Sequence, residues 1–168
     1  MTNILLKLVK RAAPVALALA AGAALADPPA AYGARRAEAI TFRDWRLHCR
    51  GEDCVLRSLV RAGDGTLLLV AEIGPDALRF ATPLPLFLPD GITLALGADP
   101  LRAIPWRTCD AQGCDAVVDL EPALRESLKR ERQAEITFTL LEGLRVRLPV
   151  SLAGVTAGLR AQGALTSP

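Results

Sequence analysis

The sequence contains one histidine, His48, and few aromatic residues, which make up 4% of the chain. A single histidine excludes a metal site with two histidine ligands and leaves a catalytic triad only one candidate base. The chain has no G-x-S-x-G, no G-x-G-x-x-G and no phosphate-binding loop motif. Its aromatic residues are too dispersed to form a platform that stacks sugars or bases. These absences argue against an enzyme and against a carbohydrate- or nucleobase-binding module.

The chain also lacks an apolar run long enough to cross a bilayer, which takes roughly 20 residues. Its longest uncharged stretch, residues 12–26, follows a basic start with Lys7, Lys10 and Arg11 and ends in Ala24-Leu25-Ala26. This layout predicts a secretory signal peptide over residues 1–26. No cysteine stands at the cleavage point, so a lipoprotein is not expected. We expect a periplasmic or secreted protein without an integral membrane segment after cleavage.

Cleavage also removes the apparent excess of positive charge. The full chain has 20 basic and 18 acidic residues, and the three basic residues of the predicted signal peptide leave 17 against 18. The balance of the mature chain therefore does not favour a nucleic-acid partner. Lys129 is its only lysine, and its arginines are scattered along the sequence. We attribute their number to codon bias and not to a binding site for phosphate or carboxylate groups.

All four cysteines lie in two stretches of equal spacing, CRGEDC at residues 49–54 and CDAQGC at residues 109–114. An even number of cysteines in an exported chain predicts disulfides. Zinc sites and thioredoxin-type redox motifs usually need a gap of two residues, not four. We therefore expect structural disulfides, no metal and no cofactor.

Three disulfide pairings remain open. A fully extended six-residue stretch would separate its cysteine Cα atoms by roughly 16 Å, whereas a disulfide needs about 5.5 Å. A local bridge therefore requires each stretch to turn back on itself. Gly51, Gly113 and Asp110 are turn residues. We favour Cys49–Cys54 and Cys109–Cys114 over the crossed pairings for this reason.

Most of the chain after the signal peptide has the alternating pattern of short strands. In residues 135–150, matching the apolar faces requires Phe138 opposite Val146 and Leu140 opposite Leu144. This parity predicts a hairpin with a three-residue loop and a positive φ at Gly143. Residues 91–97 also alternate, and residues 66–73 are nearly all apolar, as in a strand covered on both sides.

Other segments depart from this pattern. A phase change at Arg43-Asp44 suggests a bulge or bend, and three prolines make residues 83–90 an edge or polyproline-like stretch. Leucines repeating every four residues predict a helix over 120–132, with Pro122 in its first turn. Residues 151–161 suggest a second short helix with Ser151 as its cap.

The predicted fold class is therefore all-β, an antiparallel β-sandwich or open barrel with one or two short helices. The predicted organisation is a signal peptide (1–26), a flexible arm (27–39), one β domain (40–161) and a C-terminal tail (162–168).

Four stretches together resemble the invasion-associated locus B family of exported bacterial proteins. They are DWRLHC at 44–49 with Cys54, LPLFLPDGITLALG at 84–97, CDAQGC followed by AVVDL, and LPVSLAGVTAGLRA at 148–161. The chain departs from the family pattern at Val155, where phenylalanine is usual. The resemblance implies an all-β, disulfide-containing periplasmic or secreted protein, with some relatives linked to host-cell invasion. It supplies no catalytic residue.

We therefore expect a non-enzymatic interaction protein that binds a protein partner in the envelope or on a host cell. Two alternatives remain. One is a small hydrolase that uses His48 with a nearby serine or aspartate. The other is a barrel that carries an apolar ligand.

Overall fold

The computed structural model describes residues 39–83, 85–99 and 101–166. The predicted signal peptide and residues 27–38 of the predicted arm lie outside this range.

The described residues form two antiparallel sheets. The larger sheet has seven strands, in the spatial order β1 (Ile40–Phe42), β2 (Trp45–Arg50), β3 (Asp53–Arg61), β4 (Leu67–Ile73), β5 (Ala77–Thr82), β9 (Gly113–Asp119) and β8 (Trp106–Asp110). The smaller sheet has four, in the order β11 (Arg145–Ser151), β10 (Gln133–Thr139), β6 (Ile92–Leu96) and β7 (Arg102–Ile104).

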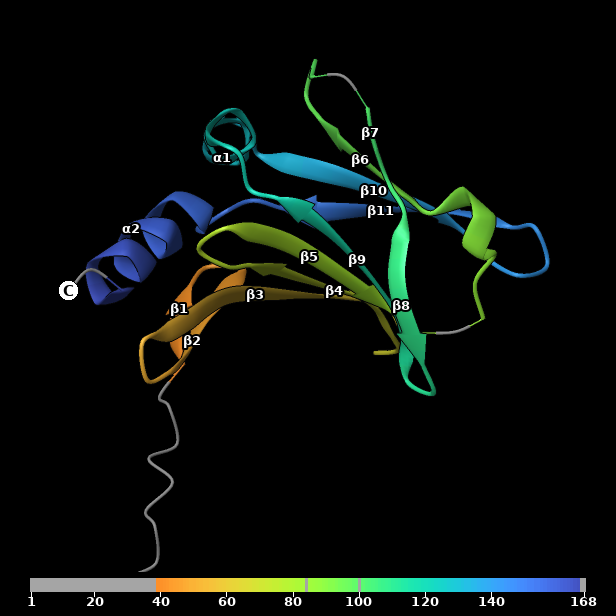
Figure 1. The fold of residues 1–168 in the computed structure, drawn as a ribbon, viewed down its shortest axis with the longest axis horizontal. Helices are drawn as coiled ribbons and strands as arrows, with labels where there is room; N and C mark the ends of the chain where they lie inside the picture. Colours follow the sequence, from red (N-terminus) through yellow and green to blue (C-terminus); the bar gives the residue numbers. More distant parts are fainter. Residues whose placement is uncertain (1–38, 84, 100, 167–168) are drawn as a thin grey trace, which may run out of the picture. The chain divides into compact units, whose positions relative to one another are not determined.

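The two sheets form a β-sandwich that is not closed into a barrel (Figure 1). Buried side chains of both sheets make one apolar cluster, which includes Leu56, Ile73, Ile92 and Ile136, each 0% exposed. The prediction of an antiparallel all-β sandwich is confirmed. Because the sheets are open, the alternative of an apolar ligand inside a barrel lacks the barrel that it requires.

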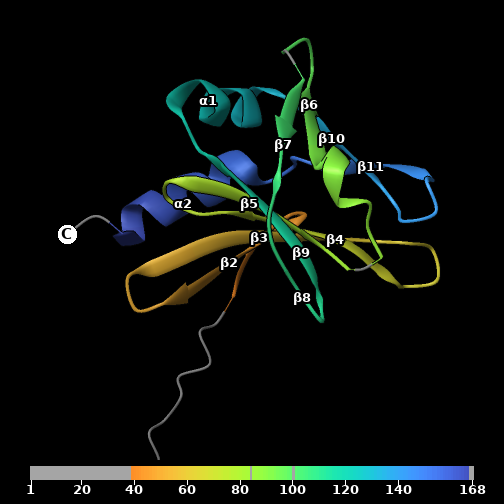
Figure 2. The same cartoon turned by 45° about the vertical axis from the view of Figure 1, so that its right-hand side comes forward.

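One continuous segment links the two sheets. β7 belongs to the four-stranded sheet and β8 to the seven-stranded sheet, and only Pro105 separates them. Figure 2 shows β7 running on into β8. β7 and β8 are both last in their sheets, so this segment places two edge strands at one corner of the sandwich.

The predicted hairpin over residues 135–150 is confirmed in its register. Phe138 lies opposite Val146, and the Leu140 N–H donates to the Leu144 carbonyl at 2.8 Å. Gly143 has a φ of 86°. β6 also alternates as predicted, with Ile92, Leu94 and Leu96 buried.

The chain reverses at Arg43-Asp44, where we predicted a bulge or bend within one strand. β1 and β2 form a hairpin with these two residues as its turn, and Phe42 lies opposite Trp45. The apolar phase changes here because the chain turns back. Arg43 adopts a φ of 55°, the positive region that glycine and asparagine usually occupy in turns. The phase change located the bend, but without glycine or asparagine the sequence did not indicate a hairpin turn.

Two helices and a short 3₁₀ helix, η1 (Leu88–Asp90), complete the fold. Helix α1 (Pro122–Arg130) begins at Pro122 as predicted and buries Leu124 and Leu128. Helix α2 (Val155–Thr166) packs against β1, β2 and β3. It starts after the predicted cap Ser151, which lies in β11, and it extends through residues 162–166 of the predicted tail.

Buried Gln162 explains this extension of α2. Its side-chain nitrogen donates to the backbone carbonyls of Cys54 and Ile73 at 2.8 and 3.0 Å. These bonds tie the last turns of the helix to β3 and β4. Neither helix in the described part of the chain could cross a bilayer.

Candidate interaction surfaces

His48 lies on the outer face of the seven-stranded sheet, the face turned away from the four-stranded sheet. Trp45, Leu47 and Cys49 of β2 point inward, so Arg46 and His48 point outward. Within the described residues, no carboxylate or hydroxyl group forms a hydrogen bond with either His48 ring nitrogen. A catalytic histidine needs both an orienting group and a nucleophile within reach. His48 has neither in this structure.

The electrostatic surroundings of His48 also disfavour its protonated form. Burial lowers the pKa of His48 below its usual value of 6.5, and the positive charges of Arg57 and Arg46 lower it further. Glu72 opposes them but does not reverse the shift. The lowered pKa of His48 therefore reflects its burial together with the positive electrostatic potential of the neighbouring arginines.

A ladder of alternating charges crosses the same face from β3 to β8. The Arg57 Nε donates to Glu72 at 2.7 Å, and Arg79 donates to the other Glu72 oxygen at 3.0 Å. Arg79 and Arg107 both approach Asp115, at 3.6 and 3.1 Å. Both carboxylates are buried, at 9% and 6% exposed, and are compensated by arginines on neighbouring strands.

Burial raises the pKa of Glu72, but hydrogen bonds from Arg79 and Arg57 and their positive charges outweigh it, so its pKa is lowered overall. Burial lowers the pKa of Arg79, and its bonds to Glu72 and Asp115 reverse that effect. Glu72 and Arg79 therefore remain ionised at neutral pH. The ladder holds the arginine side chains in fixed positions on the outer face.

The expectation that the arginines are scattered is wrong in three dimensions. Arginines from four strands and the β1–β2 turn lie on this one face, because outward positions on adjacent strands share a side of the sheet. They are Arg43, Arg46, Arg50, Arg57, Arg61, Arg79 and Arg107. Glu72 was missed as well, although a single carboxylate in the apolar run of residues 66–73 was a signal for a compensated charge.

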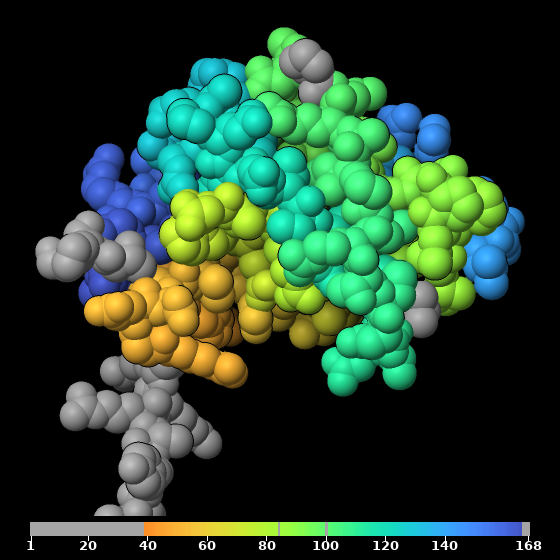
Figure 3. All heavy atoms as spheres, in the orientation of Figure 1, coloured from red at the N-terminus to blue at the C-terminus, as the bar shows by residue number. Residues whose placement is uncertain are grey.

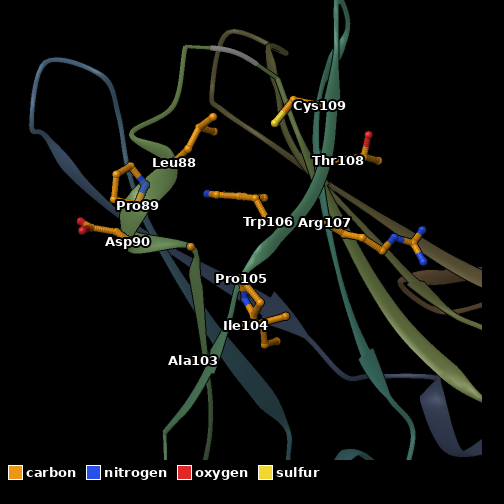
Figure 4. Close-up of a pocket in the computed structure, with 11 residues that line it drawn as sticks. Leu88, Pro89, Asp90, Ala103, Ile104, Pro105, Trp106, Arg107, Thr108 and Cys109 are labelled. Carbon is orange, nitrogen blue, oxygen red and sulfur yellow. The ribbon is translucent and has the colours of Figure 1, made fainter.

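A second surface lies at the corner where β7 runs into β8. A hollow of about 570 Å³ lies between η1 and this segment. Figure 4 shows Trp106 reaching from β8 toward Leu88 and Pro89, with the nitrogen of its ring directed at η1. This Trp106 Nε1 is buried, yet it has no hydrogen-bond partner among the described residues. A buried donor without a partner is rare and costs free energy.

The open edge of β8 borders this hollow. β8 pairs only with β9 among the described strands. The Cα atoms of Cys109 and Cys114 are 4.0 Å apart, the short spacing of a pair that shares no backbone hydrogen bonds. The N–H and carbonyl of Cys109 therefore face the open edge. An added strand could pair with them.

Exposed apolar side chains gather next to this edge. The Phe87 N–H donates to the Thr139 carbonyl, and Leu86 is bridged to Leu140, so the segment before η1 lies beside the β10–β11 hairpin. The two segments expose Phe87 (40%), Leu88 (47%), Leu141 (65%) and Leu144 (59%). We call these four residues the apolar end. Figure 3 shows the region around η1 and the β8–β9 hairpin on one side of the molecule.

The disulfides cross two hairpins. Cys49 is paired with Cys54 between β2 and β3, and Cys109 with Cys114 between β8 and β9. The structure thus has the local pairing that the turn residues favoured. The cysteines lie on the strands, directly opposite each other, with only Gly51-Glu52 and Ala111-Gln112 as turns. Asp110 starts its turn by accepting hydrogen bonds from the backbone of Gln112 and Gly113.

Comparison with known proteins places this fold in a family. The sequence profile of the Invasion associated locus B (IalB) protein family matches residues 47–163. The chain belongs to the invasion-associated locus B family. The resemblance seen in its cysteine stretches and strand motifs is thereby confirmed.

A solved structure supports the fold of this family member. The crystal structure of invasion associated protein b from Bartonella henselae is similar with a TM-score of 0.67 and 14% sequence identity. The match covers 76% of this chain and 96% of that chain. No curated protein matches the chain. The family match includes all four cysteines, His48 and Trp106, whereas Arg43 and Arg46 of the outer face precede the matched residues.

Proposed function

We propose that this family member is an exported, non-enzymatic interaction protein that binds a protein partner along the open edge of β8. The observation that carries the proposal is the buried, unpartnered indole N–H of Trp106 beside that edge. Because this nitrogen is itself buried, an acceptor on a partner can reach it only if the residues around it move as the partner binds. Export is supported by the basic and apolar start of the sequence and by the two disulfides.

The chemistry of the surface suits an extended segment of the partner. Such a segment can add to a sheet edge through backbone hydrogen bonds and place alternate side chains in neighbouring pockets. Cys109 supplies the backbone donor and acceptor, and the hollow beside Leu88 and Trp106 supplies a place for an apolar side chain. The apolar end extends this contact. A protein of the producing cell's envelope or of a host-cell surface fits the family and the export signal.

Pull-down from envelope extracts and from host-cell membranes tests this function. Trp106→Phe removes the N–H and keeps a ring, and Leu88→Asp places a charge beside the hollow. We expect both variants to lose a partner that the wild type retains. Leu165→Asp is the matched control, because Leu165 is 51% exposed on α2.

Two results would count against the proposal. One is a partner retained equally by wild type, Trp106→Phe and Leu88→Asp. The other is a partner lost only from the Leu165→Asp variant. Capture from one of the two extracts, and not the other, assigns the partner to the envelope or to the host cell.

A further inference from the structure

We propose that a hollow on the outer face of the seven-stranded sheet binds a phosphate group through Arg43, Arg46, Arg57 and Arg61. The hollow measures about 530 Å³, and Thr41 also lines it. It lies on a different face from the edge of β8, so this site is independent of the proposed protein contact.

The fold brings these arginines together from the turn and two strands. Arg43 occupies the β1–β2 turn, and Arg61 ends β3. Arg46 and Arg57 lie directly opposite each other in the pairing of β2 with β3. Like charges directly opposite on a sheet destabilise it. An anion bound between them would remove that repulsion.

Among the described residues, three of the four arginines have no acidic partner. Arg43 and Arg46 form no ion pair with any residue in the described ranges, and Arg61 donates to the Gly65 carbonyl. Arg57 is held by Glu72, which fixes its position beside the hollow. The guanidinium groups of Arg57 and Arg61 are therefore held in place before a ligand arrives, and exposed Arg43 and Arg46 can turn toward it. Arginine is well suited to this role because its planar fork matches the oxygens of phosphate.

The charge of the hollow selects phosphate over carboxylate. Four arginines against Asp44 leave the lining of the hollow with a net charge of +3, and neighbouring Glu72 is shared between Arg57 and Arg79. A phosphate monoester carries about −1.5 to −2 at pH 7, whereas a carboxylate carries one charge. Asp44 is further occupied by the Ser151 hydroxyl, which donates to it at 2.5 Å. A phosphate group would offset most of this charge, and a single carboxylate would offset less of it.

His48 lines the same hollow, so its titration is sensitive to the charge there. Its pKa is lowered by burial and by Arg57 and Arg46, with Glu72 acting in the opposite direction. A bound phosphate would offset the two arginines and raise the pKa again. Because His48 is the only histidine of the chain, its Cε1–H resonance is an unambiguous probe.

The test uses inorganic phosphate, vesicles of phosphatidic acid in phosphatidylcholine, vesicles of phosphatidylcholine alone and a tetraglutamate peptide. Binding is measured by calorimetry and by the NMR titration of His48 at each ligand concentration. Arg46→Gln and Arg61→Gln each remove one charge from the hollow. Arg145→Gln on β11 is the control, because Arg145 is exposed on the other sheet. Arg57 is left unchanged because it compensates buried Glu72.

We expect the wild type to bind inorganic phosphate or phosphatidic acid vesicles, and the pKa of His48 to rise on binding. Arg46→Gln and Arg61→Gln should each lose about tenfold in affinity. Arg145→Gln should bind as the wild type does. Binding of inorganic phosphate supports a soluble ligand, and binding of phosphatidic acid vesicles alone supports a lipid headgroup. Absence of binding in both arms, equal loss in Arg145→Gln, or equal affinity for tetraglutamate would overturn the proposal. Melting curves confirm that the variants are folded.

Discussion

Glu72 is the residue on which the outer face depends most. A buried carboxylate is tolerated only when its charge is compensated, and Glu72 receives hydrogen bonds from Arg57 and Arg79. The side chains of both arginines are 42% exposed, so solvent weakens each pair. Asp115 repeats the arrangement with Arg79 and Arg107. The ion pairs therefore connect five strands, β3, β4, β5, β9 and β8, and Arg79 of β5 is shared by the two carboxylates.

Glu72→Gln should lower the free energy of unfolding by about 2 kcal/mol at pH 7, because it leaves arginines opposite one another without their shared anion. Urea denaturation measures this change. Glu135→Gln is the control, since the Glu135–Arg147 pair spans 3.7 Å and both side chains are exposed. It should cost less than about 1 kcal/mol. Equal costs for the two variants would contradict the compensating role of Glu72.

The difference in stability between the wild type and Glu72→Gln should depend on pH. Because the folded pKa of Glu72 is lowered, its stabilising effect is complete above the unfolded value of 4.5 and is lost as the pH falls through the folded value. The difference in stability between wild type and Glu72→Gln should therefore shrink in acid. A difference that stays constant down to pH 3 would show that the charge of Glu72 is not what stabilises the fold.

His48 gives a second prediction at this scale. Its pKa in the ligand-free protein should lie below 6.5, and Arg46→Gln should raise it, because one of the two arginines that lower it is removed. Stability linked to His48 is then present above pH 6.5 and lost as the pH falls through the folded pKa. NMR titration of the ring measures both values. A wild-type pKa at or above 6.5 would rule out the positive potential that we infer.

At the scale of the elements, the start of β9 packs closely against β5. A Cβ atom on Gly113 would lie 2.1 Å from the Thr82 carbonyl oxygen of β5, which is backbone and cannot move aside alone. Gly113→Ala should therefore destabilise the protein by about 2–3 kcal/mol and disturb the β8 edge. Chemical denaturation measures the loss.

Gly143→Ala separates this clash from backbone strain. Gly143 has a positive φ of 86° but nothing within 4 Å of an added Cβ. This variant should cost about 1 kcal/mol, the penalty of a left-handed backbone. If Gly113→Ala lowered the free energy of unfolding no more than Gly143→Ala does, this result would contradict the close approach of β5 and β9.

Elements with a strong local pattern could be predicted from the sequence. The parity of Phe138 and Val146 determined the β10–β11 register, and Pro122 marked the start of α1. The hairpin turn at Arg43-Asp44 could not be predicted, because the residue with the positive φ is an arginine and not a glycine. The charge ladder could not be predicted from the sequence either. Arg79 and Asp115 are neighbours only because β5 pairs with β9, a contact between distant segments that no local pattern records.

At the scale of the whole molecule, the apolar core and not the disulfides should hold the fold together. The core joins both sheets and both helices, whereas each disulfide closes a loop of only six residues within one hairpin. Such a loop contributes roughly 2 kcal/mol, against a typical domain stability of about 5–15 kcal/mol.

The reduced protein should therefore stay folded and melt at a lower temperature. Circular dichroism with and without reductant measures this, and peptide mapping of the unreduced protein checks the pairing. Cooperative unfolding at 25 °C on reduction would contradict the prediction. A peptide linking Cys49 to Cys109 or Cys114 would contradict the hairpin pairing on which it is based.

The central claim of the proposed function is that a partner adds a strand to β8. Hydrogen–deuterium exchange of the complex with the captured partner tests it most directly, because strand addition protects backbone amides at the edge. We expect slower exchange over Trp106–Asp110 and in the segment of Phe87 and Leu88, with no change in β1 at the opposite edge of the sheet. Unchanged exchange in β8, with protection confined to α2 or to β1, would contradict the account.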